Sequence, residues 1–356
     1  MASQNSRRYK AESLGRLRLR PSSDQESEEE EVPVRSSFPL PWRIVCALYS
    51  VARGFLYRKN HTINRTLSNF VDITAKASSK PVDGVYSEDV SYGEHAEQYA
   101  RVFRPANPGT EKIPVVFFFH GGGFAILCAA SKTYDRMCRL VAKGAQAMVV
   151  SVNYRRAPEH RYPTAYDDCF EAIRWAQAEC QSGGELFAAA DATRVFFVGD
   201  SAGGNIAHFM MARAVQSDVS PLELKGVVQL HPFFGGVERS PAELRMPDAL
   251  FLSLEFTDWF WAAFLPPGAD RDHPACNVFG PGAEDLSGLA LPPILVTIGS
   301  NDILQDWQAR YVQKLRDMGK NVTTRCSDVC HAEYILDDVM QALMDESVRF
   351  IQSSAS

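Results

Sequence analysis

Two short glycine-rich segments, each placed directly after a run typical of a buried strand, constrain the fold of this chain most strongly. The first, His120-Gly121-Gly122-Gly123-Phe124, follows Pro114–Phe119; the second, Gly199-Asp200-Ser201-Ala202-Gly203, follows Arg194–Val198 and precedes a helical pattern. Flanking glycines let a strand and a helix approach without a Cβ clash, so that the turn holds a serine hydroxyl clear of the backbone. The two segments together predict acyl-transfer chemistry.

Short apolar runs alternate along the chain with stretches in which apolar residues recur at helical spacing. This alternation predicts an α/β fold, in which a mostly parallel sheet is covered by helices on both faces. The expected strands are Tyr99–Phe103, Val115–Phe119, Met148–Val152, Val195–Val198, Val227–Leu230, Ile294–Ile298 and Val322–Arg325. The expected helices are Tyr134–Ala142, Ala165–Cys180, Asn205–Val215 and Asp306–Met318.

The composition changes along the chain and suggests a domain organisation. Residues 1–36 are polar and charged, which is typical of a disordered tail. Residues 37–85 begin with apolar residues at helical spacing, and we expect an amphipathic helix in a lid or cap segment. Residues 86–353 form the predicted catalytic domain. Within it, the interval 237–285 is rich in proline and aromatic residues, and we interpret it as an inserted cap that shapes a pocket.

Charge and cysteine usage narrow the partners and the compartment. The net charge of −6 and the lack of a sustained basic patch argue against nucleic acid and favour a small-molecule ligand. The eight cysteines form no CxxC and no zinc-like pairing with histidine, so we expect reduced thiols and neither metal nor cofactor. We see no secretory signal and no transmembrane segment, and we expect a cytoplasmic protein, with the nucleus as a second compartment.

A serine nucleophile needs a base to take its proton, and the base needs a carboxylate to orient it. In the chain order of α/β-hydrolases, the acid and then the histidine follow the serine, each after a late strand. Asp302 follows the predicted strand Ile294–Ile298, and only His331 lies beyond it, one α/β unit further on. His208, two turns along the helix from Ser201, would lie about 10 Å too far along the helix axis. The expected triad is therefore Ser201, Asp302 and His331.

The oxyanion of the reaction needs preorganised N–H donors, each worth on the order of 3 kcal/mol of barrier. The backbone N–H groups of Gly122, Gly123 and Ala202 are the expected donors, because the glycines expose them and Ala202 opens the helix after the nucleophile. His120, Gly121, Gly199, Asp200 and Gly203 would support the two turns. Phosphate binding is disfavoured, since the chain has neither GxGxxG nor a P-loop lysine here.

These segments together resemble the hormone-sensitive-lipase-like branch of the α/β-hydrolases, and most of all the plant carboxylesterases that include the gibberellin receptors. The resemblance runs from about Asn64 to Phe350. It implies the α/β-hydrolase fold, Ser201 as nucleophile, Asp302 as acid, His331 as base and the HGGG segment as oxyanion loop. The other matching segments are Val152–Glu159, Tyr162–Asp168 and Asp272-His-Pro274 followed by Asn277.

The resemblance covers proteins of two functions, ester hydrolysis and hormone reception. The receptors replace the catalytic histidine with an aliphatic residue and the third oxyanion glycine with serine, whereas this chain keeps His331 and Gly123. We therefore expect a serine carboxylesterase that hydrolyses small or medium esters through an acyl-enzyme. The alternative is a receptor-like small-molecule binding protein, whose N-terminal lid, resembled by Asn64–Asp72, closes on a ligand and contacts a protein partner. A disabled hydrolase that acts as a scaffold is a third reading.

Several residues near these motifs also need an interpretation. The family usually has glycine and an aromatic after the histidine, whereas Ala332 and Glu333 follow here, which makes Glu333 an alternative acid. We expect Asp200 to bond nearby backbone or the pair Arg155-Arg156, and we expect these arginines to form buried ion pairs. Cys330 has no strand-to-helix turn to present it and is expected to be a structural thiol.

Overall fold

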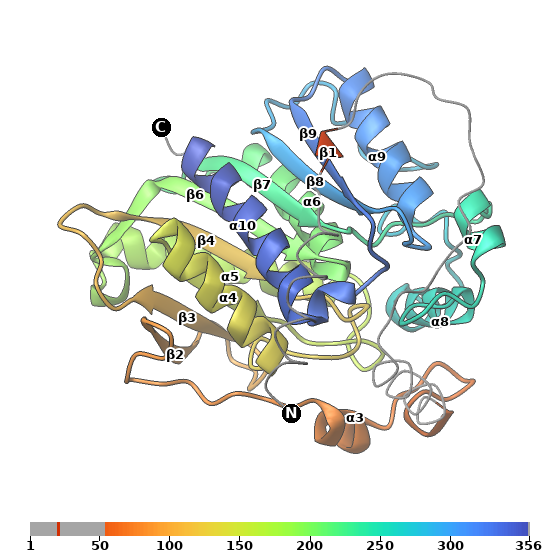
Figure 1. Cartoon of the computed structure of the whole chain (residues 1–356), viewed down its shortest axis with the longest axis horizontal. Coiled ribbons are helices and arrows are strands. Elements are labelled where there is room, and N and C mark those ends of the chain that lie inside the picture. Colours follow the sequence, from red (N-terminus) through yellow and green to blue (C-terminus); the bar gives the residue numbers. More distant parts are fainter. Residues whose placement is uncertain (1–19, 22–53, 355–356) are drawn as a thin grey trace, which may run out of the picture.

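The computed structural model describes residues 20–21 and 54–354 (Figure 1). The predicted tail, apart from Arg20–Pro21, lies outside the described residues. So does most of the amphipathic helix expected over Trp42–Leu56, of which the structure describes only residues 54–56, which are helical. The domain limits drawn from the sequence therefore stay predictions.

A single twisted sheet runs through the molecule, and the candidate site lies at the carboxyl ends of its parallel strands. Its strand order is β1-β9-β8-β7-β6-β4-β5-β3-β2. The strands from β5 through β4, β6, β7 and β8 to β9 are parallel, whereas β2, β3 and the two-residue β1 join antiparallel. The strands are β1 Arg20–Pro21, β2 Val85–Ser91, β3 Tyr99–Pro105, β4 Ile113–Phe119, β5 Met148–Asn153, β6 Ala190–Asp200, β7 Leu224–Leu230, β8 Ile294–Gly299 and β9 Val322–Ser327.

Helices cover both faces of the sheet, as the alternating sequence predicts. Helices α4 and α10 pack against each other on one face, while α5, α6 and α9 cover the other (Figure 1). The predicted α/β fold with a mostly parallel sheet is confirmed. The helices are α3 Arg65–Val71, α4 Lys132–Ala145, α5 Thr164–Ser182, α6 Ala202–Gln216, α7 Pro241–Arg245, α8 Leu254–Phe264, α9 Gln305–Asp317 and α10 Asp337–Ser354, with short 3₁₀ turns η1 Glu185–Phe187 and η2 Glu333–Ile335.

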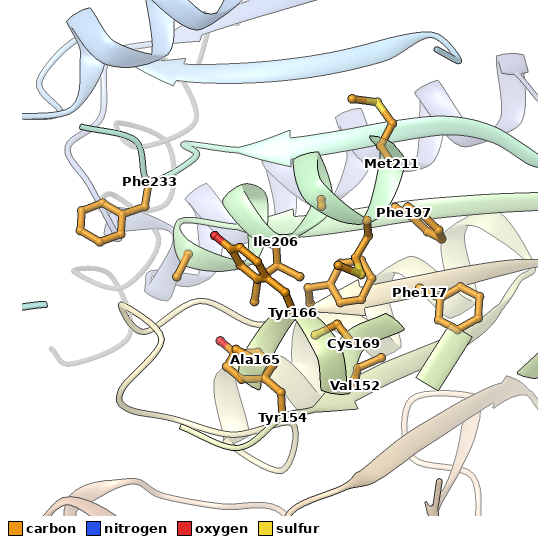
Figure 2. Close-up of a cluster of buried hydrophobic side chains, with 14 of the residues drawn as sticks. Phe117, Val152, Tyr154, Ala165, Tyr166, Cys169, Phe197, Ile206, Met211 and Phe233 are labelled. Carbon is orange, nitrogen blue, oxygen red and sulfur yellow. The ribbon is translucent and has the colours of Figure 1, made fainter. Parts of the chain in front are cut away.

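The central strands are apolar because both of their faces are buried. Every residue of β4 is buried, and successive side chains point to opposite faces of the sheet. Phe117 and Phe119 therefore join the core under α5 and α6, while Val116 and Phe118 join the core under α4 and α10. Figure 2 shows part of the first core, where Phe117 of β4 lies near side chains of β6, α5 and α6. This packing fixes the strand ends that carry the site.

The interval 237–285, which its composition predicts to be an inserted cap, packs as a helical region against the HGGG segment. It contains α7 and α8 and no strand. Helix α8 buries all five of its aromatic side chains, which are Phe256, Trp259, Phe260, Trp261 and Phe264. Phe264 stacks on Phe124 at 3.8 Å between ring centroids, so the insertion packs directly against the segment that follows the HGGG turn.

The described part of the N-terminal segment is anchored on both this insertion and the sheet domain. Trp259 Nε1 donates to the carbonyl of Arg58 at 2.9 Å, and Tyr57 packs edge-on against the rings of α8. Arg65, at the start of α3, donates to the carbonyls of Ala125 and Ala157 at 2.5 and 2.8 Å and pairs with Glu159. Residues 54–71 thus bridge α8 and the loop after the HGGG turn.

Some elements differ from the sequence expectations. Strand β2 was not predicted. It is a half-exposed edge strand whose solvent-facing positions are mostly polar, so too few apolar residues mark it in the sequence. Helix α10 was also not expected, although its buried residues recur at helical spacing. The expected strands and helices that do form have longer or slightly shifted bounds, as in β6, which begins at Ala190.

Candidate active site

Ser201 stands in the sharp turn between β6 and α6. Its backbone adopts φ +51° and ψ −117°, a strained conformation for a residue with a side chain, of a kind that concentrates at functional sites. Positions 199 and 203, two residues to either side, must be glycine. A Cβ at Gly199 would lie 2.2 Å from the carbonyl oxygen of Gly203. A Cβ at Gly203 would lie 1.9 Å from the carbonyl oxygen of Phe119. The two glycines let the strand, the helix and β4 approach closely enough to form this turn.

Three predicted side chains lie in one hydrogen-bonded chain. Ser201 Oγ is 2.9 Å from His331 Nε2, and His331 Nδ1 is 2.8 Å from Asp302 Oδ2. All three are buried. Burial raises the pKa of Asp302, but the charge of the neighbouring imidazole and its hydrogen bond outweigh this effect and hold the pKa below its ordinary value. Asp302 therefore stays ionised beside the imidazole.

The topology explains why residues far apart in sequence meet here. Ser201 follows β6, Asp302 follows β8 and His331 follows β9, and these strands are parallel members of one sheet. The carboxyl ends of parallel strands lie at the same edge, where open α/β sheets place their ligand sites. Asp302 is fixed further by the N–H of Leu304, which donates to its Oδ1 at 2.8 Å.

The HGGG turn lies beside Ser201 with several backbone donors exposed. Gly122 and Gly123 have φ of +94° and +57°, which favour glycine. Within the described chain, the N–H groups of Gly122, Gly123 and Ala202 have no protein acceptor. They are free to bind an external oxygen. A Cβ at Gly123 would lie 2.3 Å from Cδ1 of Phe260, so the ring from α8 closes on the turn.

The remaining residues of the two motifs support these turns. His120 is fully buried, stacks on Tyr154 with ring centroids 4.2 Å apart, and has its Nδ1 2.9 Å from the carbonyl of Gly121. Burial lowers the pKa of His120 to about 3, so its ring is neutral. The N–H of Gly121 donates to Asp200 Oδ1 at 2.9 Å, and this donor is therefore occupied.

Asp200 makes the first of its two expected contacts, the one to nearby backbone. Besides the backbone N–H of Gly121, its carboxylate accepts from the hydroxyls of Tyr134 and Tyr334, and it does not contact the two arginines. The reason is that the arginines pair with other carboxylates. Arg155 pairs with Asp168 at 2.6 Å and Arg156 with Glu97 at 3.2 Å.

The alternative acid, Glu333, and the alternative base, His208, bind residues other than Ser201, Asp302 and His331. Glu333 Oε2 accepts from the N–H and the thiol of Cys330, at 2.9 and 3.3 Å. Burial raises the pKa of the Cys330 thiol, which stays protonated. His208 Nδ1 is 3.0 Å from the hydroxyl of Tyr311, in the core beneath α6. Neither Glu333 nor His208 therefore occupies the position of the acid or the base.

Two residues at the site were missed by the sequence reasoning. Gln308 Nε2 donates to Asp302 Oδ2 at 3.0 Å, which makes it a second donor to the oxygen that faces His331. Tyr334 reaches Asp200 from the turn after His331. Gln308 lies nearly two helical turns after Asp302, on the buried face of α9. A polar residue on the apolar face of a predicted helix is the sequence signal that could have identified it.

A central serine turn with a histidine and an acid at later strand ends defines an α/β-hydrolase. The profile of a family described as alpha/beta hydrolase fold matches residues 116–335, and the chain belongs to this family.

Relatives of the chain include both receptors and enzymes. It is 39% identical to a gibberellin receptor of Arabidopsis thaliana over 88% of this chain and 94% of that protein. It is 35% identical to carboxylesterase 20 of Arabidopsis thaliana over 73% of this chain and 83% of that protein. Among solved structures, a hyperthermophilic esterase from the archaeon Pyrobaculum calidifontis matches with a TM-score of 0.68 and 25% identity, over 87% of this chain and 97% of that one.

The structure also bears on membranes and metals. None of the helices built from the described residues is long and apolar enough to cross a membrane. Among the side chains that the structure describes, no three His, Cys, Asp or Glu residues are grouped so as to hold a metal ion.

Proposed function

We propose that this protein is a serine carboxylesterase that hydrolyses small or medium carboxylic esters through an acyl-enzyme intermediate. The observation that carries the proposal is the hydrogen-bonded chain from Ser201 Oγ through His331 to Asp302. Such a chain activates a hydroxyl that would otherwise be a poor nucleophile at neutral pH.

Each residue has a defined role in the proposed reaction. His331 Nε2 takes the proton of Ser201 Oγ as this oxygen attacks the ester carbonyl carbon, and Asp302 stabilises the imidazolium that forms. The N–H groups of Gly122, Gly123 and Ala202 bind the oxyanion of the tetrahedral intermediate. His331 then gives its proton to the departing alkoxide, and the alcohol leaves. A water molecule attacks the acyl-enzyme in the same way, which releases the carboxylic acid and restores Ser201.

The receptor-like alternative is favoured by the similarity to gibberellin receptors and by the N-terminal segment that packs on α8. Two features support the enzyme instead. His331 provides a base, and the ring of Phe260 occupies the place that a side chain at position 123 would need. A serine at this position, as the resemblance implies for the receptors, would require the buried Phe260 to move.

The test is turnover of p-nitrophenyl acetate, butyrate and longer esters by the purified protein. We expect Ser201→Ala and His331→Ala to abolish turnover, and a fluorophosphonate probe to label the wild type but not Ser201→Ala. Ser217→Ala, at the far end of α6, is the matched control and should behave as wild type. Unchanged turnover in Ser201→Ala would refute the mechanism.

The receptor alternative makes a different prediction. A gibberellin would bind the wild type in calorimetry and protect residues 54–75 from proteolysis, without any turnover of esters. The cytoplasmic location expected from the sequence stays a prediction, which a fluorescent fusion would test.

A further inference from the structure

Asp200 is a fully buried carboxylate that the proposed chemistry leaves without a role. Its Oδ1 accepts from the N–H of Gly121 at 2.9 Å. Its Oδ2 accepts from the hydroxyls of Tyr134 and Tyr334, at 3.0 and 2.8 Å. Burial raises the pKa of Asp200 to about 6, so the carboxylate is ionised at neutral pH. Hydrogen bonds to an ionised acceptor are about twice as strong as neutral ones, so at neutral pH this group holds its three donors firmly.

The donors come from segments that carry different parts of the proposed site. Gly121 directly precedes the oxyanion glycines, and Tyr334 lies in η2, within one turn of His331. Asp200 itself directly precedes Ser201. One carboxylate therefore connects the loops of the nucleophile, the oxyanion donors and the base.

The approach of this carboxylate depends on a residue without a side chain. A Cβ at Gly121 would lie 2.5 Å from Asp200 Oδ2 and 2.8 Å from the carbonyl oxygen of Asp200. Only glycine at position 121 therefore allows the oxyanion loop to rest on Asp200. This explains the first glycine of the HGGG segment, whose N–H is not available to an oxyanion.

The start of the His331 loop is held by the turn after β8. The N–H of Asn301 donates to the carbonyl of Val329, and the side chains of Ser300 and Asn301 donate to Asp328. Ala332 adopts a left-handed conformation with φ +62°, and Glu333 bonds back to Cys330 within the same loop. Asp302 fixes the imidazole, whereas the hydroxyl of Tyr334 fixes the backbone that follows it.

We propose that Asp200 is a positioning residue that holds the His331 loop and the oxyanion loop in register with Ser201 through Tyr334 and Gly121. This inference rests on the proposed function. The contribution of each tether can be separated, because Tyr334 belongs to the histidine loop and Tyr134 belongs to α4.

The experiment compares Tyr334→Phe with the matched variant Tyr134→Phe, using p-nitrophenyl butyrate and the full chain. Both variants remove one hydroxyl that donates to Asp200 Oδ2. Tyr334→Phe also releases the loop of His331, whereas Tyr134→Phe removes a second acceptor of the Gly121 N–H, at 2.9 Å, and leaves the bond of this N–H to Asp200 in place. We expect Tyr334→Phe to lower kcat by roughly tenfold to a hundredfold with KM within about twofold, since a small misplacement of a reacting group has effects of this size. Tyr134→Phe should lower kcat several times less.

Asp200→Asn provides a second readout through the pH dependence of kcat/KM. Burial raises the pKa of Asp200 to about 6, so the wild type loses the charge of this carboxylate as the pH falls through about 6. Asp200→Asn should remove the part of the acidic limb that this titration causes, whereas in Tyr334→Phe the carboxylate still titrates and this part of the limb should remain. The titratable groups that face Asp200 are Tyr134 and Cys138 on α4, Tyr154 after β5, and Tyr334 and His331.

The outcomes separate this inference from the proposed function. An active wild type with equal kcat in Tyr334→Phe and Tyr134→Phe, or an unchanged acidic limb in folded Asp200→Asn, overturns the positioning role alone. If Asp200→Asn does not fold, the comparison of the two phenylalanine variants decides. A wild type that neither turns over esters nor reacts with a fluorophosphonate overturns both proposals.

Discussion

Replacing Gly123 with alanine tests whether the cap ring of Phe260 closes on the oxyanion loop. The added Cβ would lie 2.3 to 2.6 Å from three carbons of Phe260, a side chain that is only 4% exposed and rests on Phe256 at 4.4 Å between centroids. The ring therefore cannot move without loss of packing. Forcing such a group into a packed core costs about 1 to 3 kcal/mol.

Backbone strain adds to this steric cost and can be measured separately. Alanine at the φ of +57° of Gly123 costs roughly 1 to 2 kcal/mol, which brings the expected loss to about 2 to 5 kcal/mol. Gly319 has φ +71° and nothing within 4 Å of its Cβ position, so Gly319→Ala measures the backbone part alone, about 1 to 2 kcal/mol.

The assay is urea denaturation, which gives the free energy of unfolding of each variant. A double-mutant cycle with Phe260→Ala completes the design, because Gly123→Ala should cost only the backbone part once the ring is gone. If Gly123→Ala costs no more than Gly319→Ala, or if Phe260→Ala does not reduce its cost, the reasoning about the ring is wrong.

Four further predictions concern the triad, the buried groups and the N-terminal segment. Asp302→Asn should lower kcat for p-nitrophenyl butyrate by roughly 10⁴-fold, since the imidazole loses its orienting charge, and a loss below tenfold would contradict its role. Gln308→Leu should lower kcat by about tenfold, since a hydrogen bond to a charged group contributes about 1.5 kcal/mol, and wild-type kcat would show that Asp302 needs no second donor. Burial lowers the pKa of His208 to about 3 from an ordinary 6.5, so its contribution to stability is complete above pH 6.5 and is lost as the pH falls through this window. Between these two pH values, His208→Gln should then reduce the slope of the unfolding free energy against pH by about 1.36 kcal/mol per pH unit, the value for one bound proton. An unchanged slope would exclude a buried neutral His208. Arg65→Ala removes the donors to two carbonyls and should speed proteolysis between residues 54 and 75, whereas equal rates in variant and wild type would show that Arg65 does not anchor α3.

The parts of the fold that the sequence predicts well are those in which burial alone decides the residue types. Strand β4 is buried at every position, so its run of valine and phenylalanine can be recognised without any tertiary knowledge. Strand β2 is buried only at alternate positions near its start, and its polar residues resemble a loop until β3 pairs with it. Helix α10 carries a readable helical pattern, and its face against α4 could have been found from spacing alone.

The candidate site divides in a similar way. The order of Ser201, Asp302 and His331 follows from strand ends, and the structure brings these side chains together. The contacts of Gln308 and Tyr334 do not follow from spacing, because they depend on how α9 and the turn at η2 are oriented against the sheet. Of the two contacts expected for Asp200, the one to nearby backbone forms at Gly121. The one to the arginines does not form, because two tyrosine hydroxyls satisfy the carboxylate.

The distance along the chain between Ser201 and His331 has a consequence for how the protein folds. The two side chains are separated by 130 positions, and the histidine lies after the last strand of the sheet, shortly before the final helix. Contacts between such remote segments form late in folding, because a large loop must close before they stabilise the chain. A nascent chain released before β9 would lack both His331 and the hydroxyl of Tyr334 that binds Asp200 beside the serine. Esterase activity during refolding would therefore report the completion of the whole sheet, and not the formation of its centre.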